Sequence, residues 1–179
     1  MIFNQDRYYR FQSYLRDNKH ARWFWSFLAL YALSYIFLVG LFIFSDAVGR
    51  KVVLLGIIAF ILTWPFVAWI INFIYKKERP YQRYGFIPVA STQFFSNVHP
   101  HRYNSFPSRH TMALAAVNTV IFFFYPVIGG IGLIIAACVG IARIILGYHY
   151  PADVIFGYIL GVLSGLVVLY FVAPLLFAI

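Results

Sequence analysis

The sequence predicts an all-α protein, a polytopic membrane bundle of five transmembrane helices with an additional interfacial helix at its N-terminus. Two observations lead to this prediction. Of the 179 residues, 63% are hydrophobic and only 11% are charged, whereas a water-soluble domain carries about 25% charged residues. The charges are also segregated, because four long stretches contain no Asp, Glu, Lys or Arg: residues 23–45, 52–75, 111–142 and 154–179.

Each expected span is an apolar stretch long enough to cross the hydrocarbon core, which takes about 20 helical residues. Residues 23–44 and 52–75 are the first two spans. Residues 111–147 are long enough for two short spans, with a break expected at Tyr125 and the Pro and Gly residues that follow it. Residues 152–176 supply the fifth span. We expect the whole chain, residues 1–179, to form one domain.

Two polar segments flank or separate the spans. Residues 1–22 mix basic and aromatic side chains, which favours a short helix in the membrane interface with its cations near anionic headgroups. A frayed cytoplasmic tail is the alternative. Residues 76–108 form the only long polar stretch between spans, and a loop of this length is usually functional or disordered. We expect it to be an active-site loop, in which His99 and His101 are more typical of loop residues than of ligands.

The most informative cluster lies near the C-terminal end. After residue 110 only Arg143 and Asp153 carry full charges, with His149 between them, and ionisable groups at the edge of a hydrocarbon layer indicate function. Gly147 suits the end of one span and Pro151 the start of the next. His149 and Asp153 are four residues apart, so their side chains are expected to meet. A carboxylate on one ring nitrogen leaves the other as a nucleophile; a structural Arg–Asp pair with a satisfied His is the alternative.

A second cluster begins the helix after the polar loop. Pro107 and Ser108 precede an apolar run, which predicts a helix with Ser108 as its N-cap. The first amides of such a helix can bind an anion. His110 would lie beside that anion, where it could donate a proton to a leaving group. A capping Ser with an interfacial His is the structural alternative.

A third cluster, residues 76–80, ends the second span. Pro80 cannot continue a helix, so the span is expected to end near Arg79. Arg79 would offer its planar fork to phosphate oxygens, although by itself the cluster is typical of a membrane-flanking basic segment. Two spans separate the N-terminus from the polar loop, and two more separate that loop from residues 143–153. The N-terminus, the polar loop, the helix start after Ser108 and residues 143–153 are therefore expected to face the same side of the membrane.

In combination these motifs resemble those of the type-2 phosphatidic acid phosphatase superfamily, which also includes bacterial lipid phosphatases and vanadium haloperoxidases. The family is marked by Lys, six residues and Arg-Pro; by Pro-Ser-Gly-His; and by Ser-Arg, five residues, His, three residues and Asp. The corresponding segments here are residues 79–80, 107–110 and 143–153. The resemblance covers residues 72–153 in the same order, and the third motif is the most specific. The family's transmembrane helices also resemble the expected spans.

The resemblance implies a role for each matched residue. His149 would attack the phosphorus and form a phosphohistidine, Asp153 would orient His149, and His110 would protonate the leaving group. Arg79, Arg143 and Ser108 would hold the equatorial oxygens in the transition state. No metal or other cofactor is implied, since guanidinium groups supply the positive charge.

Three positions depart from the family pattern. Asn72 stands where the family has Lys, and Lys76, one helical turn further on, is expected to reach the phosphate instead. Arg109 replaces the Gly of the second motif and adds a cation for substrate binding. Ala142 replaces the Ser of the third. The missing Lys and the short chain resemble small bacterial undecaprenyl-diphosphate phosphatases more than the larger lipid phosphate phosphatases.

The expected function is therefore that of a metal-independent membrane phosphatase acting on a lipid phosphate or diphosphate, with undecaprenyl diphosphate the first candidate. Phosphatidylglycerophosphate, lipid A 1-phosphate and phosphoryl transfer to an acceptor lipid are alternatives within this class. A non-catalytic lipid-headgroup binder or transporter is the alternative from another class, and a vanadate-using haloperoxidase is a third. The expected partners are the lipid phosphate substrate and membrane lipids, without nucleic acid, and the sequence predicts no oligomeric state.

The expected location is the bacterial inner membrane. Basic residues in the N-terminal segment favour a cytoplasmic N-terminus, and therefore a cytoplasmic site, whereas Arg50 and Lys51 favour the opposite orientation. Bacterial lipid phosphatases of this type generally act on the outer face, and we expect the site there. No cleavable signal is expected, because residues 1–20 lack an apolar core. Cys138, the single cysteine, excludes an intrachain disulfide and is expected to be a small buried apolar side chain.

Overall fold

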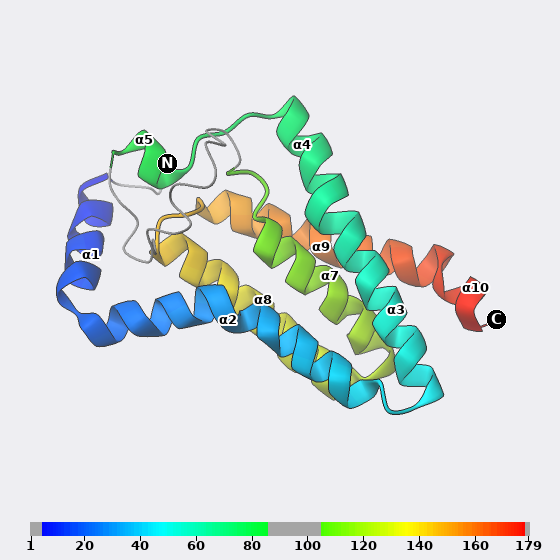
Figure 1. Cartoon of the computed structure of the whole chain (residues 1–179). Coiled ribbons are helices and arrows are strands. Elements are labelled where there is room, and N and C mark those ends of the chain that lie inside the picture. Colours follow the sequence, from blue (N-terminus) through cyan, green and yellow to red (C-terminus); the bar gives the residue numbers. More distant parts are fainter. Residues whose placement is uncertain (1–4, 86–104, 178–179) are drawn as a thin grey trace.

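A computed structural model describes residues 5–85 and 105–177. Within this part of the chain the structure is helical and contains no strand, which confirms the predicted all-α class (Figure 1). The helices are α1 (Gln5–Asp17), α2 (Lys19–Ile43), α3 (Ala47–Ile61), η1 (Leu62–Val67), α4 (Ala68–Ile74), α5 (Pro80–Arg83), α7 (Arg109–Phe124), α8 (Pro126–Ile145), α9 (Pro151–Phe171) and α10 (Ala173–Phe177).

The helix ends follow the expected chemistry. Asn18 caps α2, its side chain accepting a hydrogen bond from the Ala21 amide at 3.0 Å. Pro126 and Pro151 occupy the first position of α8 and α9, where a missing N–H costs nothing. Gly147, with φ of 80°, follows the end of α8 and turns the chain towards α9. The corner between α8 and α9 is therefore tight, as the sequence predicts.

α3, η1 and α4 form one long apolar element, Ala47–Ile74. Its middle is a π-helix with Pro65 inside it. Proline has no N–H to donate, and its ring displaces the carbonyl four residues earlier, so the hydrogen-bond ladder is widened at this point. The Thr63 hydroxyl donates to the Ala59 carbonyl at 2.8 Å, which satisfies one of the backbone oxygens near the irregular turn.

α7 is the centre of the bundle. All of its residues from Thr111 to Ile121 are buried, and it packs against α3, α8 and α9. On α9, Gly157, Gly161 and Gly165 lie four residues apart against α7; a Cβ on Gly161 would lie 2.3 Å from the carbonyl oxygen of Met112. Small residues allow such close backbone approach in membrane bundles. α7 and α9 are thus fixed relative to each other along most of their length.

The number of spans differs from the prediction. Among the described residues three elements are long and apolar enough to cross a membrane: Ala47–Ile74, Pro126–Ile145 and Pro151–Phe171. α2 is a fourth only if its two halves, bent by 48°, count as one span. The fifth expected span, α7, has 16 residues, which at 1.5 Å per residue gives about 24 Å, short of the roughly 30 Å hydrocarbon core. Five spans are therefore not confirmed, although helices occupy all five stretches.

The N-terminal segment forms a helix, but it ends earlier than predicted, because α1 stops at Asp17 and residues 19–22 belong to α2. Leu15 of α1 is buried with Ala142 of α8 and with Leu146, the C-cap of α8. The Gln12 side chain donates to the Ile145 carbonyl at 2.7 Å. α1 therefore packs across the C-terminal end of α8; its position in a membrane interface and the single-domain organisation stay predictions. Cys138 is free and only partly buried.

Candidate active site

The three polar clusters come together at one end of the bundle (Figure 1). This end contains the start of α5, the start of α7 and the corner between α8 and α9. The part of the polar loop that spans residues 86–104, with His99 and His101, lies outside the described residues. Five of the expected site residues meet here by direct contact or by mutual electrostatic influence: Arg79, His110, Arg143, His149 and Asp153.

His149 is almost completely enclosed, with 1% of its surface exposed. Its backbone amide and that of Tyr148 donate to the Arg143 carbonyl, which fixes the corner. The Nδ1 atom lies 2.7 Å from the Ser105 carbonyl oxygen. A carbonyl oxygen only accepts, so Nδ1 carries the ring proton and Nε2 keeps its lone pair. Burial, followed by the charges of Arg79 and Arg143, lowers the pKa of His149 well below its usual value. The ring is therefore neutral and can act as a nucleophile through Nε2.

Asp153 is fully buried and accepts three hydrogen bonds. They come from Lys77 Nζ at 2.6 Å, the Ser105 hydroxyl at 2.6 Å and the Tyr150 amide at 2.9 Å. Its Oδ2 lies 4.0 Å from Nδ1 of His149, too far for a hydrogen bond. The expected direct bond between Asp153 and His149 is thus replaced by an indirect one, in which Asp153 holds Ser105 and the Ser105 carbonyl holds the ring.

Lys76, the lysine expected to face the phosphate, is exposed, and its neighbour Lys77 reaches the site instead. The reason is that α4 ends at Ile74, with Tyr75 already extended, so the helical spacing assumed from Asn72 to Lys76 does not apply. In an extended chain alternate residues share a side, which favours Lys77 together with Arg79. The Lys77 ammonium also lies 4.6 Å from the centre of the Tyr150 ring.

Asn72, at the position of the family's Lys, stays inside α4. It is buried, and its Nδ2 donates to the Ala68 carbonyl at 2.6 Å, while its Oδ1 has no hydrogen-bond partner among the described residues. Asn72 therefore supplies no cation to the site. That charge comes from Lys77, five residues further along the chain.

His110 contacts Arg143 directly. The Arg143 Nη2 atom lies 2.7 Å from Nδ1 and 3.3 Å from Nε2 of His110. Because a guanidinium only donates, a ring nitrogen of His110 is the acceptor. The Trp64 ring packs edge-on against His110, with centroids 4.7 Å apart. Arg143 also lies over the Tyr148 ring, 4.8 Å from its centre. His110 is thus held between a cation and an aromatic ring.

Ser108 is the N-cap of α7, as predicted, and is completely buried. Its hydroxyl lies 3.0 Å from the Thr111 hydroxyl and makes no hydrogen bond to a helix amide. The Ser108 amide donates to the Asp153 carbonyl at 2.9 Å, which ties the start of α7 to the start of α9. The first-turn amides of α7 are therefore not occupied by the Ser108 side chain and are suited to bind an anion.

Three arginines give the site its positive charge. Arg79 is the N-cap of α5, and burial lowers the pKa of its guanidinium. Within the described part of the chain, the Nε atoms of Arg109 and Arg143 are buried without a hydrogen-bond partner. A buried N–H without an acceptor costs free energy, and phosphate oxygens would satisfy both. The set therefore fits a dianionic group with several oxygens.

Two residues of this arrangement were not predicted, Lys77 and Ser105. For Lys77 a signal exists: the residue before a proline favours an extended conformation, which argues against a helix continuing to Arg79. For Ser105 no motif points to a role, because its contribution is a backbone carbonyl and a hydroxyl placed by the end of the loop.

Comparison with known proteins identifies relatives and a family for this chain. It is 35% identical over 152 residues to "Bacitracin transport permease protein BcrC" of Bacillus licheniformis, covering 83% of this chain and 70% of that protein. It is 29% identical over 135 residues to "Undecaprenyl-diphosphatase BcrC" of Bacillus subtilis, covering 73% of this chain and 63% of that protein. No solved structure matches the chain significantly. The family model of the PAP2 superfamily matches residues 51–176, a region that contains every site residue described above, and the chain therefore belongs to the PAP2 superfamily.

Proposed function

We propose that this protein hydrolyses the phosphate or diphosphate headgroup of a membrane lipid through a phosphohistidine on His149, with undecaprenyl diphosphate as the substrate. The observation that carries the proposal is the state of His149: a buried, neutral ring whose Nδ1 proton is bound by the Ser105 carbonyl, with Arg79 and Arg143 beside it. Membership of the PAP2 superfamily and similarity to the BcrC proteins support a phosphatase. The printed name of the Bacillus subtilis relative supports the substrate.

The first chemical step is attack by Nε2 of His149 on the phosphorus. The N–P bond forms as the bond from phosphorus to the leaving oxygen breaks, and protonated His110 gives its proton to that oxygen. The phosphorylated ring becomes cationic. Its Nδ1–H continues to donate to the Ser105 carbonyl, and Oδ2 of Asp153 lies 4.0 Å from Nδ1. Buried negative charge at this distance stabilises the intermediate, which explains why Asp153 is useful without a direct hydrogen bond.

The second step returns the enzyme to its starting state. Water attacks the phosphorus, the N–P bond breaks, and neutral His110 takes a proton from the water. His110 accepts from Arg143 in the absence of substrate, so it must be protonated as the dianion binds. A bound phosphate would draw the Arg143 guanidinium to its oxygens and favour the imidazolium form of His110.

The cations and the start of α7 would bind the substrate. Arg79, Arg109 and Arg143 would contact the equatorial oxygens, together with Ser108 and the first amides of α7. Lys76 is not part of this proposal. Neither step calls for a metal or another cofactor, since the guanidinium groups neutralise the developing charge.

The location of the site is also part of the proposal. The apolar helices and the similarity to BcrC proteins support a multi-pass membrane protein. We place it in the bacterial inner membrane with the site on the extracytoplasmic face. A lipid diphosphate released on that face would reach the site without crossing the bilayer.

The experiment is release of phosphate from undecaprenyl diphosphate by the purified protein in detergent. Wild type is expected to release phosphate and His149→Ala to release none, while His20→Ala, which changes an exposed histidine on α2, should match wild type. Acid-labile phosphate should be trapped on His149. Trapped phosphate on His110 would contradict the roles assigned to the two histidines. If wild type released no phosphate from any lipid phosphate, the proposal that the protein is an enzyme would be wrong.

A transporter is the second candidate, because the Bacillus licheniformis relative is named a transport permease. A headgroup-binding transporter would bind undecaprenyl diphosphate without releasing phosphate, and His149→Ala would leave its substrate specificity intact. The same assay therefore separates the two functions.

A further inference from the structure

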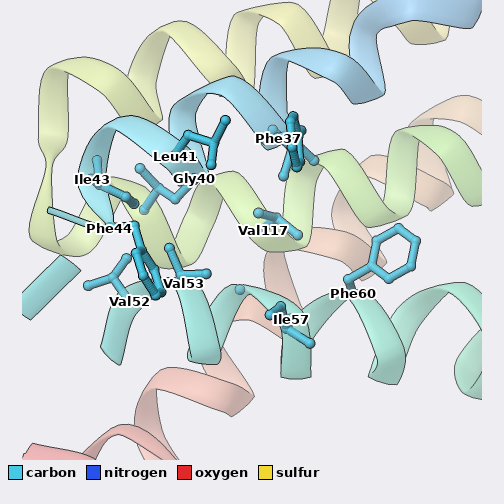
Figure 2. A pocket seen from close by; sticks show the side chains of 13 residues that line it. Phe37, Gly40, Leu41, Ile43, Phe44, Val52, Val53, Ile57, Phe60 and Val117 are labelled. Carbon is cyan, nitrogen blue, oxygen red and sulfur yellow. The ribbon is translucent and has the colours of Figure 1, made fainter. Parts of the chain in front are cut away.

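An apolar groove lies between α2 and α3, with α7 as its floor (Figure 2). Its volume is about 570 Å³, within the roughly 300–1,000 Å³ of ligand pockets. Every residue that lines it is apolar. Phe37 and Leu41 come from α2, Ile57 and Phe60 from α3, and Val117 from α7. Figure 1 shows the cause: α2 and α3 meet at their connecting turn and diverge towards the end where the site lies.

Two glycines keep the groove wide. A Cβ on Gly40 of α2 would meet no atom within 4 Å, and a Cβ on Gly56 of α3 would meet only the Val117 side chain, at 3.5 Å. These values contrast with the glycines of α9, which are in contact with α7. The protein's own packing therefore does not demand glycine at positions 40 and 56, whereas a ligand in the groove would benefit from the space.

Side-chain contacts connect the groove to the candidate active site. The Phe60 ring in its wall stacks on Trp64, with centroids 5.6 Å apart, and Trp64 packs against His110. α7 provides a second connection, because it runs from His110 at the site to Val117 and Ile121 in the groove. At 1.5 Å per residue these two side chains lie about 10 and 16 Å along the helix from His110.

We infer that this groove binds the apolar tail of the lipid phosphate whose headgroup occupies the site, an inference that rests on the proposed function. The site and the groove together suit a lipid phosphate: three arginines suit its anionic headgroup, and an entirely apolar groove between membrane helices suits its hydrocarbon chain. Trp64 and Phe60 form the wall that the first part of the tail would follow from His110 towards Gly40 and Gly56. The substrate class is thus a lipid whose tail extends well beyond 10 Å from the phosphate.

The test compares two substrates that share a diphosphate and differ in tail: undecaprenyl diphosphate and dimethylallyl diphosphate, whose tail is too short to reach Val117. Gly40→Leu fills the groove from α2, and Ile57→Phe fills it from α3. We expect kcat/KM for undecaprenyl diphosphate to fall tenfold or more, since each methylene that loses its buried place weakens binding. For dimethylallyl diphosphate the fall should be less than threefold. Leu38→Phe is the matched control, because it adds apolar bulk to α2 at an exposed position outside the groove.

A direct readout uses a photoreactive undecaprenyl diphosphate, which should label peptides of α2 and α3 in wild type and not in Gly40→Leu. Equal losses for both substrates, or no loss in either groove-filling variant, would overturn the inference while leaving the phosphatase intact. Labelling of α2 and α3 without phosphate release in wild type would support the groove and contradict the proposed function. Labelling confined to other helices would overturn the inference, because the tail would then lie outside the groove.

Discussion

Replacing Lys77 by Met, with Lys76→Met as its control, tests the part of the site that departs most from the sequence expectation. The two lysines are adjacent and chemically identical, but among the described side chains only Lys77 of the two forms an ion pair, at 2.6 Å from the fully buried Asp153. Lys76 is exposed. Any difference between the two variants therefore reports the position of the charge and not its loss from the chain.

The magnitude follows from the environment of the pair. Removing one partner of a fully buried ion pair costs about 3–5 kcal/mol, whereas an exposed pair contributes about 0–1 kcal/mol. The Lys77 side chain is 26% exposed and Asp153 is not exposed, so we expect about 2 kcal/mol for Lys77→Met. In a chain of this length that corresponds to a fall in Tm of about 4–8 °C. Lys76→Met should stay within about 0.5 kcal/mol of wild type.

Activity, like stability, should fall more in Lys77→Met than in Lys76→Met. Without Lys77 the Asp153 carboxylate is less neutralised and repels the phosphate dianion, so kcat/KM should fall about tenfold, or about 1.4 kcal/mol. Lys77→Arg should recover part of both losses, because it restores the positive charge. The assays are thermal unfolding in detergent and phosphate release from undecaprenyl diphosphate. A larger loss for Lys76→Met than for Lys77→Met in either assay would refute the reasoning and restore the original expectation for Lys76.

Three further predictions concern other parts of the structure. Ser105→Ala removes the hydroxyl from Asp153 but keeps the carbonyl that holds His149, so it should lower stability by about 1–2 kcal/mol and kcat only severalfold; complete loss of turnover would contradict the role of the carbonyl. Because burial lowers the pKa of His149, this residue binds fewer protons in the folded protein than in the unfolded chain as pH falls below about 6.5. The contribution of neutral His149 to stability should therefore be lost below that pH. Denaturant titrations should show the free energies of unfolding of wild type and His149→Gln diverging below about pH 6.5. Gly161→Ala forces a methyl group against an α7 carbonyl and should cost about 1–3 kcal/mol, measured as a fall in Tm, whereas Gly40→Ala should cost less than 1 kcal/mol.

The site could be located from the sequence, but its hydrogen bonds could not. The spacing of Arg143, His149 and Asp153 around a Gly and a Pro predicts the corner between two helices, and the structure contains this corner. The spacing does not reveal that other donors compete with the His149 ring for the Asp153 carboxylate. Asp153 has three closer donors than the His149 ring, and Ser105 comes from a loop whose path no local pattern determines.

For the membrane spans too, the sequence locates the elements but not the way they pack. Apolar stretches locate the helices, because the absence of charge over about 20 residues is a strong signal. Length alone does not reveal that α7 is a short helix surrounded by the others, nor that the hydrogen bonds of the long element change register at Pro65. Both features depend on packing between distant parts of the chain, which hydropathy does not encode.

The π-helix Leu62–Val67 determines the direction, around the helix axis, in which the residues of α4 and the following segment point. An α-helix turns about 100° per residue, and a π turn accommodates one residue more than an α turn. Deleting one residue from this segment would convert it to a regular α-helix and rotate α4 by about 100° relative to α3. Residues 75–79 would then leave the helix in a different direction, and Lys77 and Arg79 would no longer face His149. The wide turn therefore sets the direction in which the chain leaves α4 and brings two cations to a site built by α7, α8 and α9.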